Sequence, residues 1–201
     1  MEKILVVAES INVEDSSGSK ANVALIENLH KADFDLMVYH YTREEIQLEG
    51  VPCFAIPENR NSLFFYLSRL ERKLRKNLNI RIHRPLENLL GFSFTLFNDR
   101  DSIAKSIKQL ESFTPDYVLT LSKGGSFRPH QALLQIPELH NKWIAYMHDP
   151  YPMHLYPPPF AWVEPGQFRK WEFVRDISEK AQFSAFPSQL LMNWMGSYFP
   201  E

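Results

Sequence analysis

Short, continuous apolar runs recur along this 201-residue chain and constrain its fold more than any other feature. The clearest are KILVVA at residues 3–8, YVLTL at 117–121 and WIAYM at 143–147. Runs of this length without polar–apolar alternation are typical of strands that are covered on both faces. Other runs of the same kind predict further strands at residues 35–39, 51–56 and 183–186.

Helical patterns separate these runs. ANVALIENLHK, at residues 21–31, has its apolar side chains at helical spacing, and so does the segment 101–112, which Pro115 follows. A shorter helical pattern lies at 131–135. Strands that alternate with helices indicate βαβ units with right-handed crossovers. We therefore expect residues 1–201 to form one doubly wound, Rossmann-like α/β domain with a mainly parallel sheet.

Composition excludes several classes of protein. The net charge of −2 argues against a dedicated nucleic-acid binder, and one cysteine cannot form an intrachain disulfide. No apolar run approaches the ~18–20 residues that span a bilayer. The N-terminal segment also lacks the apolar core and cleavage site of a secretory signal. These observations predict a cytoplasmic protein.

A helical, basic insertion around residues 60–95 interrupts the alternation. Between Arg60 and Arg84 there are eight lysines or arginines and one acidic residue, Glu71. Five leucines share one face of the predicted helix: Leu63, Leu67, Leu70, Leu74 and Leu78. Two interpretations stay open. The helix docks on the sheet with a solvated basic face, or it lies on an anionic membrane at the inner face, through Arg72, Lys73, Arg75 and Lys76.

Ligands of open parallel sheets bind beyond the carboxyl ends of the strands, so the loops that leave those ends are the candidate sites. The first is the loop at residues 10–20, which contains Gly18 and Ser19. Its glycine permits close backbone approach, and the amides that open the next helix can meet an anionic or hydroxylated ligand. A plain surface loop is the alternative.

The second candidate loop follows the strand at 117–121. It carries Ser122, Lys123, Gly124 and Gly125. Adjacent glycines permit positive φ angles and expose backbone amides, and the lysine can neutralise a phosphate. The alternative is a tight turn with an exposed lysine.

The third candidate is His148 with Asp149, directly after the strand at 143–147. A histidine exchanges protons near neutral pH, and a neighbouring carboxylate can hold its tautomer or bind a hydroxyl. Prolines stiffen the loop beyond, and Tyr151 is the first of several aromatic residues suited to sugar rings. The others are Tyr156, Phe160 and Trp162. In the alternative interpretation, His148 caps the strand and the aromatic residues only pack.

Other catalytic and cofactor motifs are missing. The chain has no G-x-G-x-x-G fingerprint, no P-loop and no G-x-S-x-G elbow. Its histidines at 130, 140, 148 and 154 lack the spacing of a metal site. We expect no bound metal and no bound cofactor.

The order of these segments resembles the N-terminal domain of GT-B glycosyltransferases, and most closely that of the retaining family-4 type. The matching segments are KILVVAES, the loop with Gly18-Ser19, the helix ANVALIENLHK, the strand YVLTLS, the motif WIAYMHDPYP and the final FSAFPSQLLMNWM. Each motif is short, but together they span nearly the whole chain in the family's order. The first loop has one glycine where the family often has two.

This resemblance implies an acceptor-side domain of a retaining glycosyltransferase in cell-surface glycan synthesis. The partners would be a nucleotide-sugar and an acceptor glycan or lipid, without a required metal. His148 would contact the transferred sugar, and Asp149 and Tyr151 would shape the acceptor pocket. Gly18 and Ser19 would lie near the donor phosphates or the acceptor. The family's donor-binding domain is absent from these 201 residues, so we expect this chain to be inactive by itself.

Two further classes of function stay open. The chain can be a stand-alone α/β module that binds a glycan, a nucleotide or a phosphorylated metabolite. It can also be an interaction protein that uses the proline-aromatic loop and the helix at 63–78 as partner surfaces.

Overall fold

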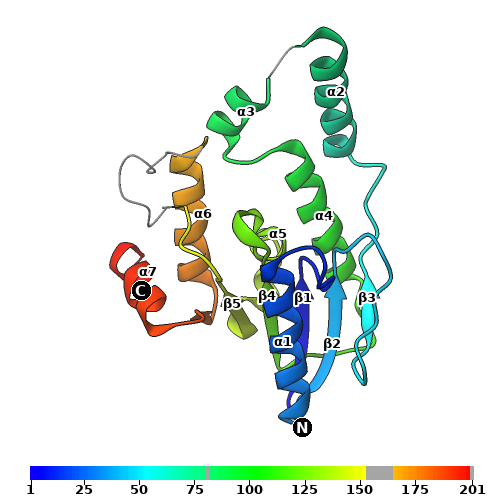
Figure 1. Ribbon diagram of the computed structural model, residues 1–201, viewed down its shortest axis with the longest axis vertical. Helices are drawn as coiled ribbons and strands as arrows, with labels where there is room; N and C mark the ends of the chain where they lie inside the picture. The colour runs from blue at the N-terminus through cyan, green and yellow to red at the C-terminus, as the bar shows by residue number, and fades with distance from the viewer. Residues whose placement is uncertain (80–81, 153–164, 200–201) are drawn as a thin grey trace.

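A computed structural model describes residues 1–79, 82–152 and 165–199, and its centre is a parallel β-sheet (Figure 1). The described residues form six strands in the order β3-β2-β1-β4-β5-β6, and every pairing between them is parallel. Their bounds are β1 Lys3–Ala8, β2 Asp35–His40, β3 Cys53–Ala55, β4 Tyr117–Leu121, β5 Trp143–Tyr146 and β6 Phe183–Ala185.

Helices cover both faces of this sheet, which confirms the doubly wound α/β fold. The α-helices are α1 Ser17–Lys31, α2 Leu63–Leu78, α3 His83–Leu90, α4 Phe94–Lys108, α5 Arg128–Leu133, α6 Gln167–Lys180 and α7 Gln189–Tyr198, with 3-10 turns at Gly124–Ser126 and Pro137–Lys142. Leu5 and Val7 of β1 belong to a core shared with α4, α5, α6 and α7. Ile4, Val6 and Ala8 belong to a second core shared with α1. This alternation of side chains explains why β1 reads as a continuous apolar run.

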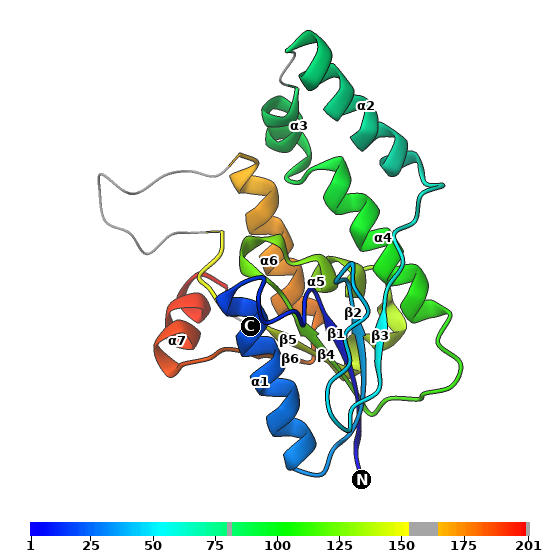
Figure 2. The same cartoon turned by 45° about the vertical axis from the view of Figure 1, so that its right-hand side comes forward.

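The predicted elements occur with shifts at their ends. Helix α1 begins at Ser17 rather than at residue 21, because the Ser16 hydroxyl accepts a hydrogen bond from Ser19 N at 3.1 Å and caps the helix. Helix α4 begins seven residues before the predicted start, with Ser93 as its cap. The insertion is helical as expected. It contains α2 and α3 and leads into α4 (Figure 2). Within the described residues, none of the helices combines the length and the apolar character that a membrane span requires.

His130 is a fully buried titratable group in α5, beneath the carboxyl end of β5. Its Nε2 lies 3.1 Å from the carbonyl oxygen of Tyr146, which can only accept, so Nε2 carries the proton. Its Nδ1 has no partner within the described part of the chain. Burial lowers the pKa of His130 to about 3 from an ordinary 6.5.

We expect this histidine to make the fold sensitive to mild acid. Since its pKa is lower in the folded state, the unfolded chain binds the proton first. The stabilisation is therefore complete above pH 6.5 and is lost as the pH falls towards 3. When the pH falls from 7 to 5, protonation of this histidine in the unfolded chain lowers the free energy of unfolding by about 2 kcal/mol. Urea unfolding at the two pH values measures this loss. A His130→Gln variant with an unchanged pH dependence would contradict the assignment.

Candidate functional site

The carboxyl edge of the sheet brings the predicted site residues together. The strand order reverses between β1 and β4, and this switch point is where open α/β sheets bind ligands. Residues 122–125 follow β4 at this point, and Gly18 and Ser19 lie in the first turn of α1 beside them. His148 and Asp149 come directly after the neighbouring strand β5. The three candidate loops therefore share one edge.

Asn22, a residue that the sequence analysis missed, connects these loops. Its side-chain nitrogen donates to the carbonyl oxygens of Ser10 at 3.1 Å and Ser122 at 3.2 Å. Its side-chain oxygen lies 2.8 Å from Nε2 of His148. Asn22 is fully buried on the inner face of α1, next to Val23. A polar residue among the apolar positions of that helix was the available signal.

These contacts fix the tautomer of His148. Two carbonyl oxygens require the amide nitrogen of Asn22 as their donor, so its oxygen must accept, and Nε2 of His148 must carry the hydrogen. Nδ1 then holds a lone pair in the neutral ring. It has no hydrogen-bond partner in the described residues, and the His148 side chain is only half-buried. His148 thus presents a hydrogen-bond acceptor, or a base, at the carboxyl edge.

The surroundings of His148 favour the neutral imidazole. The ring is half-buried and lies edge-on to the ring of Tyr146, with 4.8 Å between their centroids. Burial lowers the pKa of His148, and the charge of Asp149 opposes this shift only in part. Asp149 itself is exposed. A neutral His148 can accept a hydrogen bond from a ligand hydroxyl at physiological pH.

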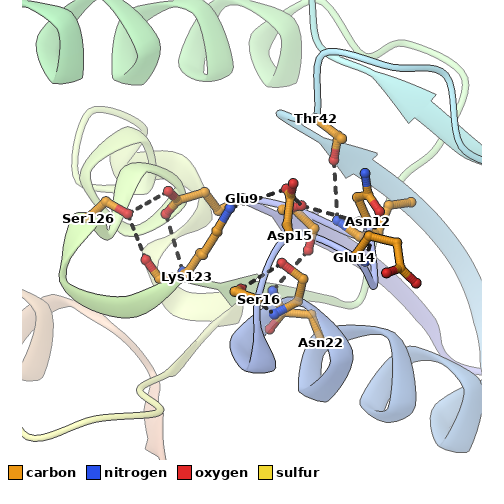
Figure 3. Close-up of polar contacts among 12 residues, drawn as sticks. Glu9, Asn12, Glu14, Asp15, Ser16, Asn22, Thr42, Lys123 and Ser126 are labelled. Carbon is orange, nitrogen blue, oxygen red and sulfur yellow. Dashed lines mark hydrogen bonds and ion pairs between the residues drawn. The ribbon is translucent and has the colours of Figure 1, made fainter.

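The loops on either side of the switch point are bonded to each other (Figure 3). The buried carboxylate of Glu9, just after β1, accepts hydrogen bonds from the hydroxyl of Ser126 and from the amide of Lys123 at 3.3 Å. The ammonium of Lys123 lies 3.2 Å from the carboxylate of Asp15. A hydrogen bond from Ser10 and the contact with Lys123 hold the pKa of Asp15 below its ordinary value. Lys123, which the sequence offered as a group able to neutralise a phosphate, is therefore already paired.

Glu9 also belongs to a largely buried cluster of ion pairs. Arg128 pairs with Glu9 and also with Asp99, at 2.6 Å. Asp99 in turn accepts a hydrogen bond from the hydroxyl of Tyr41 at 2.8 Å. Burial by itself would lower the pKa of Arg128, but the two carboxylates raise it above the ordinary value. The cluster holds the Glu9 carboxylate in place, and it is a second feature that the sequence analysis missed.

A cavity of about 310 Å³ opens beside the switch point. Gly125, Ser126 and Tyr151 line it from the carboxyl edge, and residues of α3, α4 and α6 line the other sides. The buried ring of Tyr151 packs on Phe127, and a side chain at Gly125 would come within 3.1 Å of that ring. Tyr151 is therefore part of the cavity wall. The other predicted aromatic residues, Tyr156, Phe160 and Trp162, and His154 lie outside the described residues.

The other predicted positions have less distinctive surroundings. Gly124 adopts a positive φ of 57°, as expected for the turn after β4. Gly18 does not, and a side chain there would find ordinary contact distances, so its backbone does not require glycine. No group of three potential metal ligands occurs within residues 1–79, 82–152 and 165–199. Comparison with protein-family models finds none that matches the chain, and no curated protein matches its sequence.

Proposed function

We propose that this chain is the acceptor-side domain of a retaining glycosyltransferase, which moves a sugar from a nucleotide-sugar to an acceptor glycan or lipid. A second Rossmann-like domain would hold most of the donor. The proposed setting is cell-surface glycan synthesis on the cytoplasmic side. The proposal rests on the resemblance of the sequence motifs and on one geometric observation, the placement of His148.

That observation is the open Nδ1 of a neutral imidazole at the carboxyl edge of the sheet. Asn22 holds the ring from one side, so the free nitrogen is available to a hydroxyl of the transferred sugar. The nearby Glu9–Lys123–Asp15 contacts also support an acceptor role. A loop whose cation is already paired suits a hydroxylated ligand better than a phosphate.

Sugar transfer by the complete gene product that contains these residues tests the proposal. A panel of nucleotide-sugars and glycan or lipid acceptors identifies the substrates, and His148→Ala is then compared with the parent protein. We expect kcat/KM to fall about 10- to 100-fold, because a hydrogen bond to the reacting sugar is lost. His30→Ala, at the far end of α1, is the control and keeps full activity.

Two results would contradict this role: no transfer with any nucleotide-sugar, or a folded His148→Ala protein with parental activity. A second candidate is a module that binds glycans without turnover, and the paired state of Lys123 supports it as much as it supports the acceptor role. Glycan binding that is lost in His148→Ala, in a complete gene product that transfers no sugar, would support this second candidate.

A further inference from the structure

Helix α2 carries an exposed apolar stripe. At 3.6 residues per turn, its five leucines fall within an arc of about 80°. The exposed fractions are 70% for Leu63, 52% for Leu70 and 61% for Leu78. Within this fully described helix, Ser68 is the one buried residue. Large apolar side chains at such exposure on a single stripe indicate a surface that meets something other than water.

The opposite arc of the same helix is cationic. Arg69, Arg72, Lys73, Arg75 and Lys76 lie there, and Glu71 is the one acidic residue between Leu63 and Leu78. The side chains of all five cationic residues are exposed. A helix with leucines on one side and lysines and arginines on the other has the pattern of helices that lie in a bilayer interface.

The body of the protein leaves three leucines of this stripe exposed, while Leu67 and Leu74 are half-buried. Helix α2 is anchored through its first turns: the Ser62 hydroxyl bonds Asn98, and the ring of Phe64 lies 5.3 Å from that of Phe97. Beyond this anchor, α2 extends away from the sheet, past the carboxyl ends of the strands (Figures 1 and 2). Phe64 lies between the apolar and the cationic arc of α2, so the helix is attached to the body of the protein along that boundary.

Other exposed apolar side chains lie at the same end of the molecule. Leu89 of α3 is 67% exposed, and Phe168 at the start of α6 is 71% exposed. These two helices meet there, since Gly166 N donates to the side chain of Asn88 at 3.1 Å. Helices α2 and α3 both lie beyond the carboxyl edge in the two views. Exposed apolar side chains therefore lie on three helices at one end of the protein.

We propose that this surface, formed by the stripe and cations of α2 with Leu89 and Phe168, binds the surface of an anionic lipid bilayer. The cations match an anionic headgroup layer, and the leucines can enter the boundary with the acyl chains. A nucleic acid would use the cations but leave the leucines in water. The proposal is independent of the proposed sugar transfer, because it concerns α2 rather than the switch point.

Vesicle flotation of the purified chain tests the proposal. With vesicles of 70% phosphatidylcholine and 30% phosphatidylglycerol, we expect the protein to float, and with pure phosphatidylcholine to stay largely at the bottom. Reversal of Arg72, Lys73, Arg75 and Lys76 to glutamate should weaken partitioning about 100-fold. Leu63→Ser with Leu70→Ser should weaken it about 10-fold. Neither variant removes a buried group, so both should fold.

Matched controls separate a local effect from a change in net charge or hydrophobicity. Arg43, Lys31, Lys105 and Lys108 are exposed cations outside α2, and their reversal to glutamate changes the charge by the same amount. Leu190→Ser with Met192→Ser removes two apolar side chains that are exposed on α7. Both controls should float like the parent. A parent that stays unbound, as expected if an acidic protein is the true partner, would overturn the proposal. So would α2 variants that float as well as their controls.

Discussion

Replacement of Gly166 by alanine is expected to lower the free energy of unfolding by about 3–5 kcal/mol. Gly166 has a φ of 72°, a region that strains residues with a side chain. An added Cβ would also lie 2.2 Å from the carbonyl oxygen of Glu87 and 2.6 Å from the Cα of Gly91. These neighbours are backbone atoms of the α3 end, which cannot move aside without separating α3 from α6.

Two other glycines separate the cost of the positive φ from the cost of the close Cβ contacts. Gly124 has a φ of 57°, but a Cβ there meets no described atom within 4 Å, so Gly124→Ala should cost only about 1–2 kcal/mol. Gly196 lies inside α7 with neither problem, and Gly196→Ala should stabilise by up to about 1 kcal/mol. Urea unfolding of the three variants gives the ranking. A Gly166→Ala protein as stable as Gly124→Ala would show that α3 and α6 are not in close contact.

The sequence predicts the strands of the sheet well because each strand is encoded by residues that are adjacent in the sequence. Residues 3–8 and 117–121 form strands with the predicted bounds, since each buried strand needs an unbroken apolar run. The strand at 143–147 is one residue shorter than expected. Once parallel strands are expected, their carboxyl ends must share an edge. The common location of Gly125 and His148 at that edge was therefore predictable without any contact.

The details of the site could not be predicted because they depend on partners distant in the sequence. Glu9 and Arg128 are 119 positions apart, and Asn22 and His148 are 126 apart. Nothing near Lys123 in the sequence indicates that Asp15 neutralises it. A tyrosine such as Tyr151 is suited to stack on a sugar ring when it is exposed. In the structure its ring packs on Phe127 and forms part of a cavity wall. Residue types indicate a chemistry, but the fold decides which groups are already satisfied.

Asn22→Leu is the second variant with a large expected effect, about 3 kcal/mol of unfolding free energy. It leaves the carbonyl oxygens of Ser10 and Ser122 buried without their donor and removes the acceptor of His148. Ser122→Ala is the control at the same place. The hydroxyl of Ser122 is buried and has no partner in the described residues, so its removal should leave stability unchanged or slightly improved. Equal losses for the two variants would contradict the network.

Asn22→Asp then tests the effect of residue 22 on the pKa and the tautomer of His148, apart from its effect on the free energy of unfolding. A carboxylate at this position still accepts from Nε2, but its charge favours the imidazolium, so the pKa of His148 should rise above that of the parent. Nitrogen-15 NMR of the imidazole measures both the pKa and the tautomer. In the parent the proton should reside on Nε2, while Asn22→Leu should show a mixture of tautomers because the acceptor is gone. A parent ring protonated on Nδ1 would remove the open acceptor at the carboxyl edge, and with it the geometric basis for binding a sugar hydroxyl there.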